Sequence, residues 1–171
     1  MKYIGIDIGT KNLAICILRH KHDVIKIKYW NVLDISGTNI HDIITNLTHE
    51  MNKITYKTYN AKHVYVEQQT NKNKYGYYLS LILETYFKTL KTPVHLISPK
   101  KKFEAILGSK YNAALNTTYR ARKKYAILIV KEFLDETESS SLEYFNSVDK
   151  KDDLADALII CLKGMNYQIS Q

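Results

Sequence analysis

The chain has 171 residues, a length that fits one domain, and 45% of them are hydrophobic, enough to build a core. No apolar run approaches the roughly 20 residues of a membrane-spanning helix, and the chain opens on a strand-like segment, so we expect neither a signal peptide nor a membrane anchor. Residues 1–131 hold 22 Lys and Arg against 8 acids, whereas residues 132–171 hold 3 Lys against 9 acids. This basic body predicts a polyanionic partner.

Basic residues are also clustered along the sequence. A Lys-rich composition by itself can reflect an AT-rich genome, but that does not account for the runs at 100–102 and 120–124. Neither run belongs to a clearly amphipathic segment with a broad apolar face, so nucleic acid is favoured over a membrane surface.

The first part of the chain predicts an antiparallel meander. Apolar residues alternate over 2–8, and turn residues at 9–12 and 20–23 separate this strand from strands at 13–18 and 24–33. One face of the first strand carries Ile4, Ile6 and Ile8, and the other carries Tyr3, Gly5 and Asp7.

Helices and strands alternate in the middle of the chain. The predicted elements are a helix at 38–54, a strand at 62–67, a helix at 75–90 and a strand at 93–97, then helices at 99–106 and 119–134, a polar loop at 136–148 and a final helix at 152–165. Helical connections between strands imply parallel crossovers. We therefore predict an α/β fold: one domain over 1–171, with a mixed five-stranded sheet of three antiparallel and then two parallel strands, flanked by helices.

Four carboxylates stand out against this basic background. Asp7 ends the first strand and Glu67 ends the fourth, and ligands of α/β sheets bind beyond such strand ends. Asp153 and Asp156 lie three residues apart, on one face of the final helix. Asp152, four residues before Asp156, competes with Asp153 for the same role.

Together these acids predict a metal site. Carboxylate oxygens select Mg²⁺ or Mn²⁺, and two such ions roughly 4 Å apart form the clamp that nucleases use on a phosphodiester. Taken singly, Asp7 could instead form a turn, and Asp153 and Asp156 could instead stabilise the start of the final helix. Glu67, which ends a very apolar run, is the hardest to explain by packing.

The remaining reactive residue types favour no other chemistry. Cys16 and Cys161 lie in apolar segments and are expected to be buried thiols in a reducing compartment. The six histidines show no zinc-ligand spacing with them.

The motifs that carry these acids resemble those of a known family. They are Asp7-Ile8-Gly9-Thr10-Lys11-Asn12, Val66-Glu67-Gln68 and Asp153-Leu154-Ala155-Asp156-Ala157-Leu158. The chain resembles the RuvC-like Holliday junction resolvases of the ribonuclease H-like superfamily, and within them the poxvirus resolvase branch. Ile97-Ser98-Pro99 and the basic Tyr119–Lys124 segment support this likeness, which runs from Met1 to about Leu162.

The resemblance implies an activity and a site. It implies a homodimer that cuts four-way DNA junctions with paired nicks and leaves 5′-phosphate and 3′-hydroxyl ends, in recombination or in resolving viral genome concatemers. It implies that Asp7, Glu67, Asp153 and Asp156 bind two Mg²⁺ ions, with Mn²⁺ substituting, and that Lys123 or Lys124 is the essential lysine. It implies no nucleotide cofactor and no membrane, with the cytoplasm of an infected cell as the compartment.

Several alternatives stay open at this stage. Arg120 and Arg122 fit plain backbone-phosphate binding. Tyr75, Tyr77 and Tyr78 fit either stacking on unpaired bases or an ordinary half-buried surface. Another ribonuclease H-like nuclease acting on RNA, an actin-like ATPase and a non-catalytic nucleic-acid-binding module are the rival functions. The ATPase fold needs two copies of the domain, for which 171 residues are too few.

Overall fold

The computed structural model describes residues 1–99, 118–137 and 139–167. Its five strands form one sheet in the order β3-β2-β1-β4-β5. The strands are β1 (Lys2–Ile8), β2 (Asn12–Lys21), β3 (Val24–Asp34), β4 (His63–Glu67) and β5 (Val94–Ile97). β1, β2 and β3 pair antiparallel, and β4 pairs parallel with both β1 and β5. The predicted fold class is therefore confirmed.

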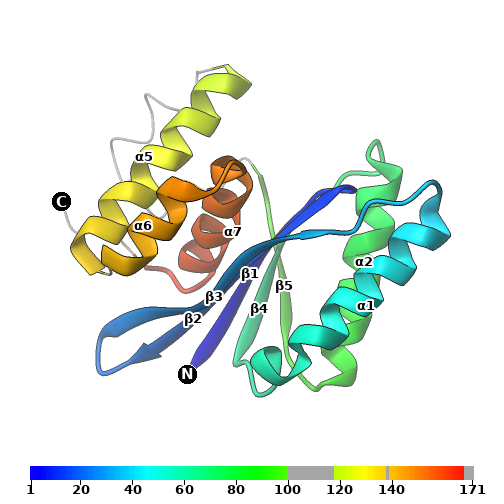
Figure 1. Ribbon diagram of the computed structural model, residues 1–171. Coiled ribbons are helices and arrows are strands. Elements are labelled where there is room, and N and C mark those ends of the chain that lie inside the picture. The colour runs from blue at the N-terminus through cyan, green and yellow to red at the C-terminus, as the bar shows by residue number, and fades with distance from the viewer. Residues whose placement is uncertain (100–117, 138, 168–171) are drawn as a thin grey trace.

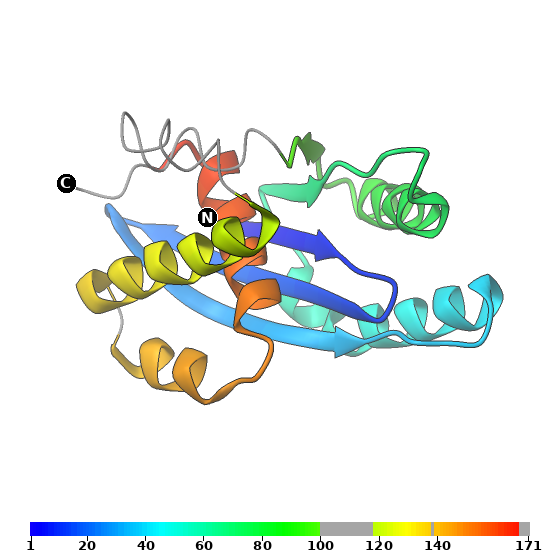
Figure 2. The ribbon, with the colours of Figure 1, turned by 90° about the horizontal axis from the view of Figure 1, so that it is seen from above.

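Helices cover both faces of this sheet (Figures 1 and 2). On one face α1 (Ile40–Thr58) and α2 (Lys74–Thr89) bury the side chains of Ile4, Ile6 and Ile8. On the other face α5 (Tyr119–Thr137), α6 (Ser139–Ser147) and α7 (Lys151–Gly164) pack over Tyr3 and Tyr65. The alternation along β1 thus separates two apolar layers, as the period-2 pattern predicts.

α7 lies closest to the sheet because β1 carries a glycine beneath it. A Cβ at Gly5 would clash with the carbonyl oxygen of Ala157 and lie 2.7 Å from Cys161 Cβ. The α7 side chains from Leu154 to Leu162 are buried apart from Asp156. This contact holds the middle of α7 close to the middle of β1.

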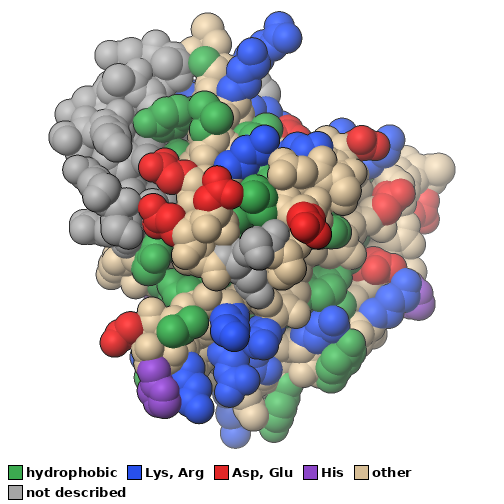
Figure 3. Space-filling view, turned by 60° about the vertical axis from the view of Figure 1, so that its left-hand side comes forward, with side chains coloured by type: hydrophobic (Ala, Val, Ile, Leu, Met, Phe, Trp, Pro, Cys, Tyr) green, Lys and Arg blue, Asp and Glu red, His purple; other side chains and the backbone are tan. Residues whose placement is uncertain are grey.

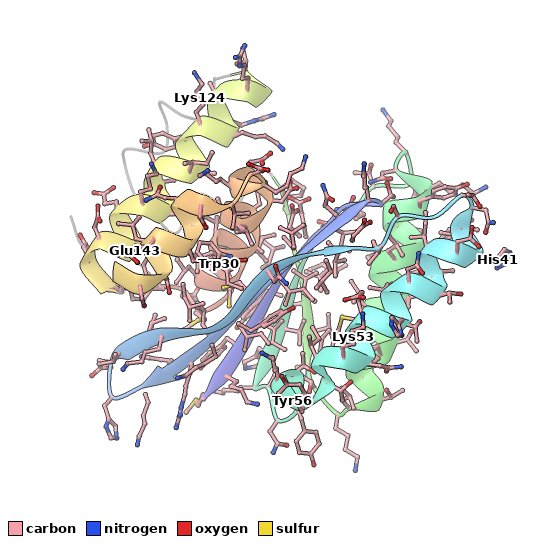
Figure 4. All side chains as sticks on the ribbon, viewed as in Figure 1. Trp30, His41, Lys53, Tyr56, Lys124 and Glu143 are labelled. Carbon is pink, nitrogen blue, oxygen red and sulfur yellow. The ribbon has the colours of Figure 1, made fainter. Side chains whose placement is uncertain are left out.

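The structure corrects one prediction, the polar loop at 136–148. α5 extends to Thr137, and most of the remaining segment forms α6. Two apolar residues three apart explain the helix: Phe145 is fully buried and Leu142 packs against the same core. The Phe145 ring stacks on that of Trp30 from β3, with centroids 5.1 Å apart and planes within 8° (Figure 4 labels Trp30). Tertiary burial outweighs the polar composition of the segment.

β3 contains a bulge that keeps its apolar face in phase. Ile17 pairs with Tyr29 while Leu18 pairs with Ile27, so Lys28 is an extra residue without a partner in the register. Ile27 before the bulge and Trp30 after it therefore face the same core. The turn before β3 has two residues with positive φ, His22 and Asp23, as two-residue hairpin turns require.

Two further expectations concern thiols and membranes. Cys16 and Cys161 are buried and not disulfide-bonded, as predicted. No helix in the described parts of the chain has the length and apolar character needed to cross a membrane. The predicted helix at 99–106 and the Lys100–Lys102 cluster lie, from residue 100 onward, outside the described residues.

Candidate active site

Asp7 and Glu67 lie at neighbouring strand ends. The parallel register pairs Ile6 with Val66, so the two acids are the next residues of adjacent strands. Each belongs to the set of side chains that faces α7, because Tyr3 and Tyr65 of the same strands do so. Both acids are half-buried. The sheet therefore brings Asp7 and Glu67 to one edge, as predicted.

The third component is the start of α7. Asp152 and Asp153 belong to its first turn, where carboxylates are favoured by the helix dipole. The side-chain amide of Asn12, which begins β2 just after the Asp7 turn, donates to Asp153 Oδ2 at 3.5 Å. Trp30 Nε1 donates to the Leu154 carbonyl at 2.9 Å and holds this turn against β3. The α7 acids are thereby tied to the Asp7 end of the sheet.

A lysine from α5 reaches the same turn. Lys123 Nζ donates to Asp152 Oδ2 and lies 3.8 Å from Asp153 Oδ1. Lys124 is exposed, and its side chain points away from the helix toward solvent (Figure 4). The sequence leaves these two lysines equivalent, whereas the structure directs Lys123 to the acids.

The two neighbouring aspartates have pKa values shifted in opposite directions. Burial raises the pKa of the Asp153 carboxyl, the charge of Asp152 raises it further, and Lys123, Lys150 and Asn12 offset this only in part. Burial also acts to raise the pKa of Asp152, but the hydrogen bond and charge of Lys123 outweigh it, so that pKa is lowered. Asp152 is thus ion-paired with Lys123, while Asp153 is a half-buried carboxyl beside the Asp152 charge.

Glu67 is held by a chain of amides that the sequence reading did not identify. Gln69 Nε2 donates to Glu67 Oε2 at 3.2 Å, and Asn73 Nδ2 donates to Gln69 Oε1 at 2.9 Å. Asn73 also caps α2, because its Oδ1 accepts from the Gly76 amide at 3.2 Å. A Cβ at Gly76 would lie 2.8 Å from Gln69 Oε1, so a larger residue there would displace these hydrogen-bonded amide side chains. The feature of the sequence that points to this arrangement is the pair Gln68-Gln69, which directly follows Glu67.

Other predicted residues lie apart from this cluster or at its margin. Tyr75, Tyr77 and Tyr78 are exposed on α2, and Arg120 and Arg122 are exposed on α5. Within the described ranges, no three His, Cys, Asp or Glu side chains are grouped closely enough to form a metal site. The assignment of four metal ligands therefore stays a prediction.

The comparisons with known proteins give the family. A family model described as poxvirus A22 protein matches residues 2–170. The chain is similar to a crystal structure of the fowlpox virus Holliday junction resolvase, with 21% sequence identity and a TM-score of 0.67. The match covers 96% of this chain and 97% of the fowlpox virus chain. A structure of fowlpox virus resolvase with Holliday junction DNA has 23% identity, the same coverage and a TM-score of 0.69.

A bacterial protein shares the fold as well. Thermus thermophilus RuvC in complex with a Holliday junction substrate is 19% identical, covers 98% of this chain and 94% of its own, and has a TM-score of 0.67. No curated protein sequence shows significant similarity to the chain. At these identities the structures establish the fold, that of RuvC-like resolvases with a ribonuclease H-like core. Since the family model spans nearly the whole sequence, the chain belongs to the poxvirus A22 protein family.

Proposed function

We propose that this chain is a Holliday junction resolvase, an endonuclease that cuts opposed strands of a four-way DNA junction. The observation that carries the proposal is the pairing of two strand-end acids, Asp7 and Glu67, at one edge of the sheet. Asn12, just after the Asp7 turn, donates to Asp153 of α7, and Lys123 lies 3.8 Å from the same carboxylate. Family membership and the fold shared with resolvases solved on junction DNA support it. The cytoplasm of an infected cell is the proposed compartment.

The donor set fits a hard divalent cation. Asp7, Glu67, Asp153 and Asp156 offer only carboxylate oxygens, the ligand type of Mg²⁺ and Mn²⁺. The raised pKa of Asp153, caused first by burial and then by Asp152, indicates that a positive charge is favoured beside it. When bound there, Mg²⁺ would supply Lewis acidity at the phosphate and lower the pKa of an attacking water.

The protein's own residues have distinct proposed roles. Gln69 orients Glu67 by donating a hydrogen bond to one carboxylate oxygen. With the carboxylate held in this way, the direction of the other oxygen is also set. Lys123 is placed to stabilise negative charge on the phosphate as it becomes five-coordinate. Arg120 and Arg122, exposed three residues and one residue before Lys123 on α5, are proposed to contact backbone phosphates. Hydrolysis then leaves 5′-phosphate and 3′-hydroxyl ends.

A substrate comparison tests the proposal. The protein is incubated with a synthetic four-way junction, a linear duplex and an RNA–DNA hybrid in Mg²⁺, and the products are sized on both strands. Symmetric paired nicks on the junction alone are expected. Preferential cutting of the hybrid would instead make the chain a ribonuclease H-type enzyme.

Variants separate binding from catalysis. Asp7→Asn and Glu67→Gln are expected to bind the junction and to lose Mg²⁺-dependent cleavage, because each removes a proposed metal ligand. Asp149→Asn, an exposed acid just before α7, is the matched control and should cleave normally. Normal cleavage by either site variant would refute the proposed metal site. Junction binding without cleavage by the parent and by both variants would favour a non-catalytic binding module.

A further inference from the structure

The β2–β3 hairpin carries a basic hollow at the end of the sheet opposite the acids. The residues that line it, here called the hairpin surface, enclose about 460 Å³: Arg19, Lys21, His22, Val24, Lys26 and Lys28. Lys and Arg side chains gather in the lower part of the molecule in Figure 3, the part that holds this hairpin in Figure 1. The proposed catalytic site uses none of them.

Strand geometry places these cations on one side. Leu18 and Ile25 turn toward the core under α5 and α7, so Arg19 and Lys26, which pair across the strands, turn the opposite way. Lys28 is the extra residue of the β3 bulge, and bulges increase local twist and redirect a side chain. The hollow is thus the uncovered side of a twisted, overhanging hairpin.

The positive charge of the hairpin surface is not neutralised locally. Arg19, Lys21, Lys26 and Lys28 are exposed, and no carboxylate of the described ranges forms an ion pair with them. The nearby Asp23, in the turn, lies 4.0 Å from His20 instead. Lysines also protect edge strands such as β3 from pairing with another chain. That role needs no cations on the inner strand β2, which supplies Arg19 and Lys21.

The C-terminal end of α1 adds a further cation, beside two aromatic rings. Lys57 Nζ lies 4.6 Å from the ring centroid of Tyr29 in β3 and 5.4 Å from that of Tyr56. Tyr56 is 72% exposed and points outward at the lower end of α1 (Figure 4). Cations interleaved with exposed aromatic rings are typical of nucleic-acid-binding surfaces.

The hairpin surface is too far from the acids to contact the same phosphate. Asp7 pairs with Ala14, and Lys21 lies seven residues farther along β2. At about 3.3 Å per residue this separation is roughly 23 Å. A group bound at the hairpin surface therefore belongs to a different part of the substrate or to a different molecule.

We propose that the hairpin surface binds the phosphate backbone of a second stretch of double-stranded DNA, about two-thirds of a helical turn from the scissile phosphate. The choice of DNA as the polyanion rests on the proposed function. The contacts are to phosphate, so they add affinity and positioning without sequence preference.

The test measures binding of a linear duplex without divalent metal, as a function of salt. Lys26→Gln/Lys28→Gln should weaken binding and reduce the slope of log K against log salt by about one to two, since each lost phosphate contact removes about 0.9. Lys88→Gln/Lys91→Gln removes the same charge at the end of α2 and should leave the slope within about 0.3 of the parent. Lys26→Arg/Lys28→Arg should keep the parental slope because both charges are retained, and Lys26→Gln/Lys28→Gln should keep the parental circular dichroism spectrum.

The outcomes are separable from those of the proposed function. An unchanged slope in Lys26→Gln/Lys28→Gln, or an equal loss in the Lys88/Lys91 control, would overturn the hairpin surface as a DNA site. Binding of anionic phosphatidylserine vesicles that depends on Lys26 and Lys28, with unaltered duplex binding, would also overturn it. Failure of the proposed nuclease activity would show in the junction cleavage assay and leave this binding result standing.

Discussion

Single side chains decide the chemistry at the start of α7. Asp152 and Asp153 are adjacent in sequence, yet Lys123 donates a hydrogen bond to the first and lies farther from the second. Burial raises the pKa of Asp153, and the Asp152 charge adds to it, whereas for Asp152 burial is outweighed by the hydrogen bond and charge of Lys123, which lower the pKa. We therefore propose that Asp152 positions Lys123 and that Asp153 is the metal ligand of the pair.

Lys123 and Lys124 of α5 are expected to differ in their effect on cleavage. Lys123→Ala should reduce junction cleavage by about 10²–10³-fold, the usual cost of losing a group that stabilises transition-state charge. Lys124→Ala, whose side chain is exposed, should stay within about threefold of the parent because it loses only a solvent-facing charge. Single-turnover cleavage rates at saturating protein measure both. Equal losses of cleavage rate in the two variants would contradict the assignment of Lys123, rather than Lys124, to the site.

A histidine pair gives a pH dependence of stability. His63 Nδ1 and His95 Nε2 are 3.0 Å apart, and burial, then the His95 charge, then Lys62 lower the pKa of His63 below 6.5. A lowered pKa favours the neutral ring in the folded state, so its stabilising contribution is present above pH 6.5 and is lost as pH falls below that value.

The variant His63→Gln isolates this contribution. Its unfolding free energy should fall less than that of the parent between pH 7.5 and pH 5 in urea titrations, since Gln does not titrate. His49→Gln, at an exposed position of α1, should follow the parental curve. A His63→Gln curve parallel to the parent would contradict the assignment.

At the scale of elements, the approach of α7 to β1 places the acids. Gly5 lets the helix lie against the strand, and the nearest obstacle to any larger residue is the main chain of Ala157 rather than a flexible side chain. A change of side-chain rotamer therefore cannot relieve the clash that a larger residue at position 5 would make. The β1–α7 contact therefore couples fold stability to site geometry.

Gly5→Ala tests that coupling. The added methyl should push α7 from the sheet, with a loss of about 1–3 kcal/mol in unfolding free energy as for other overpacked cores. Cleavage under conditions where the variant is still folded should fall as well, because Asp153 and Asp156 move with α7. Ser140→Ala, exposed on α6, is the control and should change neither quantity. A variant as stable and active as the parent would show that α7 tolerates the shift.

The whole molecule separates charge by region. Asp7 and Glu67 lie side by side at one end of the sheet, while the hairpin surface at the other end is basic. A duplex that spans both would be attracted along its length and neutralised by metal and lysine only at the cut. This division explains how a strongly basic chain can carry a concentrated acidic site.

A four-way junction also sets an expectation for assembly. Its two scissile phosphates lie on opposed strands, and each chain holds one candidate site, so two copies related by a twofold axis are required. We expect the 19.9-kDa chain to sediment as a homodimer at micromolar concentration. Sedimentation velocity measures this directly. A monomer that makes paired nicks would contradict the expectation.

The five strands, the sheet type and the strand-end acids Asp7 and Glu67 could be predicted from the amino-acid sequence. Local periodicity and turn chemistry act over a few residues, so they are readable without coordinates. The helix at α6 was missed because its stability comes from Phe145 against Trp30, a contact between residues 115 positions apart.

Three features can be recognised only in the folded chain: Lys123 faces the acids, Gln69 and Asn73 hold Glu67, and the β2–β3 hairpin presents a basic hollow. Lys123 and Lys124 are chemically identical neighbours, and the rotation of α5 against α7 alone distinguishes them. The hollow depends on a bulge at Lys28, whose register follows from pairing with β2. Side-chain direction is set by packing between distant elements, and that information is not local in the chain.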